Sequence, residues 1–124
     1  MRVLVDTNAL IWFLVDDRSL STAARDAIQA ADEVFVSAVS LWEIAIKSAR
    51  GRLDVPDDLE ARLPALGFQE LPVAWRHARI CGTLEPHHAD PFDRMLVAQA
   101  LADDLTIVTR DREIPRYGVR VIAA

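Results

Sequence analysis

The apolar residues of this chain fall into two alternating patterns. Short runs of apolar, mostly β-branched residues predict buried strands, and longer segments with apolar residues three or four positions apart predict helices. The expected strands cover residues 3–5, 34–36, 68–71, 106–108 and 119–122. The expected helices are a first one carrying Leu10, Ile11, Phe13 and Leu14, then helices over residues 21–30, 40–49, 57–66, 74–84 and 92–103. Helices therefore separate most of the strands.

This alternation predicts an α/β fold. Strands separated by helices pair in parallel through right-handed crossovers, so we expect a three-layer α/β/α sandwich with a mostly parallel central sheet. With 124 residues and no internal repeat or linker, residues 1–124 are expected to form one domain. The loops at the carboxyl ends of parallel strands meet at one edge of the sheet, where ligands usually bind.

Four acidic residues stand where these loops are expected to meet. They are Asp6 after the first strand, Glu43 one turn into the third helix, Asp93 at the start of the last helix, and Asp111 after the strand at 106–108. Their position at one edge makes them candidates for a shared site.

Each acid also has a structural explanation when it is taken alone. Asp6 or Asn8 would cap the first helix. Ser40 and Glu43 have the spacing of a capping box, in which the glutamate reaches back to the N-cap amide. Asp93 would lie near the positive end of its helix. These explanations predict surface caps rather than a functional cluster.

The joint pattern favours a metal site. Asp93 shares one helix face with the apolar Leu96 and Val97, and Glu43 is flanked by Trp42 and Ile44, so both acids point toward the interior. Two carboxylates about 4 Å apart repel by about 4 kcal/mol at an effective dielectric constant of about 20. A divalent cation removes that cost, and oxygen ligands suit Mg²⁺ or Mn²⁺. Such a site is equipped for phosphodiester hydrolysis.

Composition and charge exclude several other classes. The net charge of -5 argues against a general nucleic-acid coat protein, which is normally basic, but not against an enzyme that acts on nucleic acid. The lone Cys81 excludes an intramolecular disulfide framework and a cysteine-based zinc site. No apolar run reaches the roughly 18 residues of a membrane span, and an acid at position 6 comes too early for a signal peptide. We therefore expect a cytoplasmic protein without a membrane partner.

Four segments resemble the PIN-domain ribonucleases, and among them the VapC-type toxins of prokaryotic toxin–antitoxin pairs. The segments are VLVDTN at residues 3–8, SAVSLWEIAIK at residues 37–47, HHADPFDR at residues 87–94 and VTRD at residues 108–111. They occur in the family's order and with similar spacing, and they span nearly the whole chain.

The resemblance implies a PIN-like fold and a metal-dependent endoribonuclease acting on RNA. By position, the residues that hold Mg²⁺ or Mn²⁺ would be Asp6, Glu43, Asp93 and Asp111. Asn8 and Thr109 would be polar supports of the site, and Asp90 would cap the helix that carries Asp93. The resemblance also implies a homodimer and a cognate antitoxin protein, whose tail would cover the acidic site.

Four basic residues are candidates for contact with RNA phosphates. Arg94, Arg110 and Arg112 flank two of the acids. Lys47, the only lysine, follows Glu43 by one helical turn and can instead pair with that carboxylate.

The histidines are not expected to bind metal. His87 and His88 are adjacent, so their side chains point apart in an extended chain, and no third imidazole is near them in sequence. His88 could contact an RNA phosphate from its loop, but we expect it to lie on the solvated surface.

Two alternative functions are weighed against the ribonuclease. A haloacid-dehalogenase-like phosphatase also begins with a strand that ends in aspartate, but it needs a second acid two positions later, where this chain has Asn8. A catalytically inactive PIN-like binding or scaffold domain has no need to keep all four acids. The sequence therefore favours the enzyme.

Overall fold

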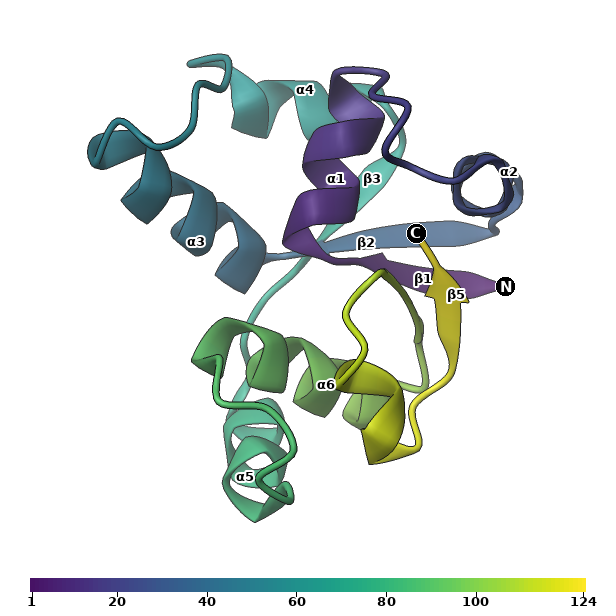
Figure 1. Ribbon diagram of the computed structural model, residues 1–124, viewed down its shortest axis with the longest axis vertical. Helices are drawn as coiled ribbons and strands as arrows, with labels where there is room; N and C mark the ends of the chain where they lie inside the picture. Colours follow the sequence, from purple (N-terminus) through teal and green to yellow (C-terminus); the bar gives the residue numbers. More distant parts are fainter.

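A computed structural model describes residues 1–124 and shows a five-stranded, entirely parallel sheet in the order β3-β2-β1-β4-β5 (Figure 1). The strands are β1 (Arg2–Val5), β2 (Glu33–Ser37), β3 (Phe68–Leu71), β4 (Thr106–Thr109) and β5 (Val121–Ala123). β1 lies at the centre, and its last three residues are completely buried, which explains the continuous apolar run in the sequence.

Helices cover both faces of the sheet, as the sequence predicts (Figure 1). The helices are α1 (Thr7–Leu14), α2 (Thr22–Ala30), α3 (Ala38–Ala49), α4 (Leu59–Ala65), α5 (Trp75–Thr83), α6 (Pro91–Asp103) and the short 3₁₀ helix η1 (Ile114–Tyr117). Helices α1 to α4 pack on the face to which Val3 and Val5 point. Helix α6 and η1 pack on the opposite face around Leu4 and Ile107. The three-layer α/β/α architecture is confirmed.

Several expected boundaries shift by a few residues. Helix α3 begins at Ala38 rather than at residue 40, because Ser37 is the N-cap and accepts a hydrogen bond from the Val39 amide at 3.0 Å. The capping-box explanation for Ser40 and Glu43 is therefore wrong. Helix α4 is shorter than residues 57–66, β5 covers residues 121–123 rather than 119–122, and η1 was not predicted.

The expected caps of α1 and α6 are confirmed. Asp6 follows β1 directly and caps α1, with its Oδ1 accepting from the Ala9 amide at 2.8 Å. Asp90 caps α6 with Pro91 at the first helical position, and its Oδ1 accepts from the Phe92 amide at 2.8 Å. No helix is both long enough and apolar enough to cross a bilayer.

Parallel pairing places the starts of the site-bearing segments at one edge of the sheet. Strand β1 pairs with β2 on one side and with β4 on the other. The chain leaves these three neighbouring strands at Asp6, at Ser37 and at Thr109, so α1, α3 and the loop carrying Asp111 all begin at the same edge.

Candidate metal centre

Asp6 is the most buried of the four acids, with 7% of its surface exposed. Its Oδ1 caps α1, and its Oδ2 accepts a hydrogen bond from Thr109 Oγ1 at 2.5 Å. Burial raises the pKa of Asp6, and the charges of Asp111 and Glu43 add to this rise, whereas the bonds from Thr109 and Ala9 lower it. The net effect is a raised pKa, as expected of a carboxylate among like charges.

Glu43 reaches the same region from α3. It is 8% exposed, and its Oε2 accepts a hydrogen bond from Lys47 Nζ at 2.8 Å. One turn earlier, Ser40 Oγ accepts from Thr7 Oγ1 at 3.1 Å, which fixes α3 against α1 next to Asp6. Of the rejected capping box, Ser40 thus makes a tertiary contact, and Glu43 pairs with Lys47 on the same helix.

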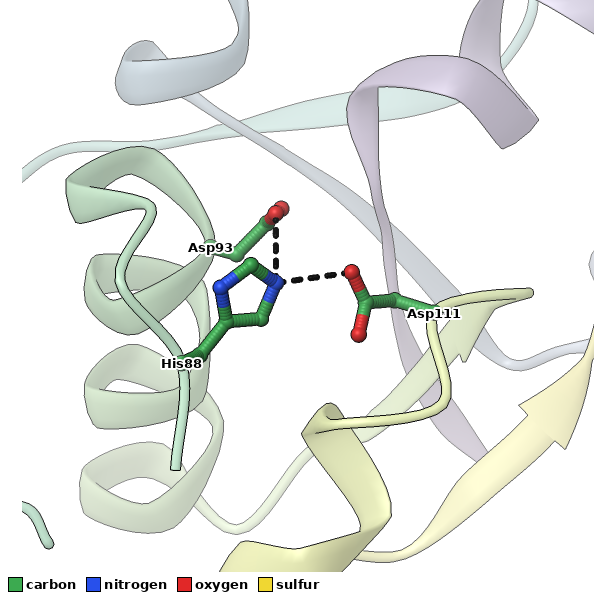
Figure 2. A group of neighbouring side chains, drawn as sticks. All are labelled: His88, Asp93 and Asp111. Carbon is green, nitrogen blue, oxygen red and sulfur yellow. Dashed lines mark hydrogen bonds and ion pairs between the residues drawn. The ribbon is translucent and has the colours of Figure 1, made fainter. Parts of the chain in front are cut away.

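Asp93 and Asp111 meet at the imidazole of His88 (Figure 2). His88 Nε2 lies 2.7 Å from Asp111 Oδ2 and 3.2 Å from Asp93 Oδ2. One ligand atom from each of these residues falls within 4.8 Å of the others, a spacing that suits a single metal ion. The Oδ1 of Asp111 separately accepts from the Glu113 amide at 2.7 Å, which orients its carboxylate.

The electrostatics of the cluster are those of crowded carboxylates. Burial and the charge of Asp90, with smaller contributions from Asp111 and Asp6, raise the pKa of Asp93 to about 7, although His88 opposes the rise. Burial also acts on Asp111, but the hydrogen bonds from His88 and from the Glu113 amide lower its pKa overall. The four acids of the sequence pattern are therefore linked by charge, and a cation would relieve the repulsion.

The donor set fits a divalent cation with oxygen ligands. Asp93 and Asp111 bring carboxylate oxygens within reach of one ion, and the charges of Asp6 and Glu43 act on the same region, although these two acids lie outside that group. Hard cations such as Mg²⁺ and Mn²⁺ prefer such ligands and keep open positions for water and substrate.

The expected supporting residues differ in their placement. Thr109 is 1% exposed and joins two acids, since its hydroxyl donates to Asp6 and accepts from the Asp111 amide at 3.0 Å. Asp90 contributes the cap of α6 and a charge that acts on Asp93. Asn8 is exposed and its side chain makes no hydrogen bond, so this structure gives it no supporting contact.

Arg94 is held inside the fold, contrary to the expectation of a phosphate contact. Its guanidinium donates to the backbone carbonyls of Cys81, Leu84, Glu85 and His88 and to the Tyr117 hydroxyl, at 3.0 to 3.4 Å. Every one of these acceptors lies in or beside the segment between α5 and α6, or in η1. Arg94 therefore stabilises the segment that carries His88.

Arg110 is likewise engaged with the protein. Its guanidinium donates to the backbone carbonyls of Ala124 and Ser19 and lies over the Trp12 ring, 4.4 Å from the centroid. Arg112 differs from both, because it is exposed and forms no side-chain hydrogen bond or ion pair. Among the three arginines, only Arg112 keeps a free guanidinium beside the acids.

This difference predicts the effects of two substitutions. We expect Arg94→Ala to lower the free energy of unfolding by about 2–3 kcal/mol, because hydrogen bonds to a charged group are worth about 1.5–3 kcal/mol and several partly buried carbonyls would lose their partner. The matched Arg112→Ala should change it by less than about 0.5 kcal/mol. Urea denaturation of the two variants measures the difference, and similar losses in both would contradict the assigned role of Arg94.

His88 is the site residue that the sequence analysis missed. Its side chain is only 15% exposed, so the expected position on the solvated surface is wrong. Burial lowers the pKa of His88, but the hydrogen bond to Asp111 and the charges of Asp111, Asp93 and Asp90 outweigh it and raise the value. One feature of the sequence could have indicated that His88 belongs to the site: it lies two residues before the N-cap of α6 and five residues before Asp93.

A model of the PIN domain matches residues 3–119, and the chain belongs to this family. Among curated proteins it is similar to Ribonuclease VapC22 of Mycobacterium tuberculosis, with 30% identity over 124 residues that cover 90% of this chain and 88% of the relative.

Solved structures show the same fold. VapBC2 from Rickettsia felis bound to a promoter DNA fragment contains a chain that matches with a TM-score of 0.72 and 12% identity, covering 98% of both chains. DNA-bound VapBC from Salmonella typhimurium gives a TM-score of 0.73 with 19% identity, covering 98% of this chain and 97% of the other. The predicted PIN-like fold is confirmed.

Proposed function

We propose that this protein is a metal-dependent endoribonuclease and the toxin of a toxin–antitoxin pair. The observation that carries the proposal is the acidic cluster, in which Asp93 and Asp111 lie within the spacing of a single metal ion and burial, the charge of Asp90 and smaller contributions from Asp111 and Asp6 raise the pKa of Asp93 to about 7. The 30% identity to a protein named a ribonuclease supports RNA as the substrate. Neither the inactive scaffold nor the phosphatase explains both facts.

In this proposal Asp93 and Asp111 hold the cation, with Asp6 and Glu43 completing the acidic site. A bound Mg²⁺ or Mn²⁺ supplies a nucleophilic water and stabilises negative charge that develops on the phosphate. The chain's own residues orient these groups. Thr109 fixes Asp6 through its hydroxyl, and the amide of Glu113 fixes Asp111.

Lys47 and Arg112 are the residues that we propose to contact RNA phosphates. Lys47 Nζ is within hydrogen-bond distance of Glu43 while 44% of its side chain remains exposed, so the ammonium is available at the edge of the acidic site. Arg112 follows Asp111 directly and has no partner in the protein. Both cations would hold the substrate backbone without reading its sequence.

An antitoxin would cover both a groove of mixed polarity beside α3 and the acidic site. A pocket of about 420 Å³ between α3 and the segment leading into α4 is lined by Leu41, Ile44, Val55 and Leu59, with Glu60 among its polar residues. An amphipathic helix of a partner fits such a groove, and a basic residue on the same partner would bind the carboxylates. The solved structures that resemble this chain include VapBC proteins, which supports this partner.

A homodimer would bury a second apolar face. Trp42 is 62% exposed although its ring packs edge-on against Phe92, with ring centroids 5.2 Å apart. Val73 and Met95 line the same surface pocket as these aromatic rings. Pairing of two copies through this face would remove a large apolar patch from water.

Metal removal tests the proposed activity. The purified protein should cleave RNA in Mg²⁺ or Mn²⁺ at pH 7–8 and should stop in EDTA, because the carboxylates alone provide no nucleophile. Sequencing of RNA ends after brief induction, with the Asp6→Asn variant as the control, should locate the cleavage sites. Cleavage that survives exhaustive chelation would remove the metal mechanism.

Co-expression tests the proposed partner. Production of the protein alone should arrest growth, and co-expression with the product of the neighbouring gene should restore it and yield a stable complex. A protein that is harmless when overproduced and that leaves RNA intact would favour the scaffold alternative.

A further inference from the structure

The imidazole of His88 is held more firmly than a loop side chain usually is. Its backbone amide donates to the Tyr117 hydroxyl at 2.9 Å, and its carbonyl accepts from Arg94 at 3.3 Å. Arg94 and Tyr117 are themselves hydrogen-bonded at 3.2 Å. The two residues therefore clamp the His88 backbone on both sides, and the side chain reaches the carboxylates from a fixed base (Figure 2).

The hydrogen bonds of the ring define its tautomer. Nδ1 accepts from the Asp90 amide at 3.0 Å, so Nδ1 carries no proton in this arrangement. The proton of the neutral ring is then on Nε2, which faces Asp111 Oδ2 at 2.7 Å and Asp93 Oδ2 at 3.2 Å. His88 thus presents an N–H donor, rather than a lone pair, to Asp111, and the same nitrogen lies in contact with Asp93.

We propose that His88 is a positioning residue of the metal centre, which holds Asp93 and Asp111 at the separation needed for a shared cation and is not itself a ligand. The proposal rests on the metal site of the proposed function. For Nε2 to bind an ion, the proton would have to move to Nδ1, where it would face the Asp90 N–H. Asp111 can instead bind the ion through one lone pair and keep accepting from Nε2 through another, while Asp93 stays in contact with the same nitrogen.

Loss of a residue that positions metal ligands weakens metal affinity by a typical factor. Groups that orient metal ligands from outside the coordination sphere typically contribute about 10–100-fold to metal affinity. Without the Nε2 donor, the repulsion between Asp93 and Asp111 would drive the two carboxylates apart, and metal binding would have to bring them together again.

The test measures Mg²⁺ and Mn²⁺ binding to the 124-residue chain by titration calorimetry, without RNA. His88→Phe keeps a ring but removes the donor, and we expect it to weaken binding of both ions by about 10–100-fold. His88→Gln offers an amide N–H in the same region and should recover most of the affinity. The matched control is His87→Phe, because His87 packs against the Tyr117 ring and touches neither acid. Unchanged affinity in His88→Phe overturns the proposal.

Nitrogen NMR of the wild-type ring gives a second measurement, which does not depend on how the variants fold. The ¹⁵N shifts of His88 should report a protonated Nε2 and an unprotonated Nδ1, both before and after addition of the diamagnetic Mg²⁺. Inversion of this pattern on metal addition would make His88 a ligand and overturn the positioning role. A protein that passes both tests but cleaves no RNA would contradict the proposed function and leave this inference standing.

Discussion

Asp6→Asn is expected to lower the rate of RNA cleavage at least about 100-fold, equal to about 2.7 kcal/mol of activation free energy. The substitution keeps the shape of the side chain and an oxygen that can accept from the Ala9 amide, so the cap of α1 survives. It removes a negative charge that is 93% shielded from solvent, since only 7% of Asp6 is exposed. Asp93→Asn and Glu43→Gln should cause losses of the same size for the same reason.

Single-turnover cleavage of RNA under saturating metal measures this effect, and circular dichroism checks the fold. The matched control is Asp90→Asn, three residues before Asp93 on the same helix turn. Asp90 caps α6 through Oδ1, and asparagine is an equally good cap, so this variant should lose far less activity. If Asp90→Asn abolishes cleavage while Asp93→Asn does not, the choice of Asp93 over Asp90 is incorrect.

Asp93→Asn should also stabilise the metal-free protein at pH 8, and the gain should depend on pH. The pKa of Asp93 rises from 3.8 to about 7 in the fold, so the folded state holds a proton that the unfolded state releases between these values. The free energy of unfolding of the wild type therefore falls as the pH rises from about 4 to 7 and is constant above that range. Asparagine does not titrate, so its advantage grows over the same interval.

The expected gain in the free energy of unfolding follows from the rise in the pKa of Asp93. A rise of about 3 pKa units sets an upper limit of about 4 kcal/mol, and loss of the favourable charge near the start of α6 removes about 0.3–1 kcal/mol of it. We expect a net gain of about 1–3 kcal/mol at pH 8, which should disappear near pH 4. Urea denaturation in EDTA at several pH values gives the curve, and excess Mg²⁺ should cancel the gain by stabilising only the wild type.

Asp111→Asn provides a control of opposite sign. The pKa of Asp111 lies below its usual value because His88 and the Glu113 amide stabilise the carboxylate, so its stabilising contribution is already present above about pH 4. The variant should be less stable than the wild type at pH 5, where the Asp111 carboxylate and the His88 imidazole stabilise each other. A gain from Asp111→Asn would mean that His88 does not stabilise this carboxylate.

The sequence by itself determined the layers of the fold and the segments that carry the acids. Apolar runs such as 3–5 and 106–108 become buried parallel strands because they are apolar on both faces. The cap of α6 at Asp90 and Pro91 could also be predicted from the sequence, because Asp90 binds backbone amides no more than three residues away. Short-range patterns were sufficient for these elements because the contacts that decide them are local.

Only the tertiary structure decided which polar groups meet across segments. Ser40 and Glu43 have the spacing of a capping box, but Ser37 caps the helix, and packing turns Ser40 toward Thr7. The sequence predicted that Arg94 could contact a phosphate. In the structure its guanidinium donates instead to backbone carbonyls of residues that precede α6. Neither outcome leaves a trace in local spacing.

His88 shows the physical reason most directly. Its ring touches Asp111, 23 residues later, because α6 and the loop after β4 converge at one edge of the sheet. A periodic pattern predicts which face of a helix or strand is buried. It does not predict which residues will contact a partly buried loop side chain such as that of His88, which is 15% exposed. The contact forms because segments that are distant in the sequence meet in the fold. Only the tertiary structure therefore shows that His88 Nε2 lies between the two carboxylates.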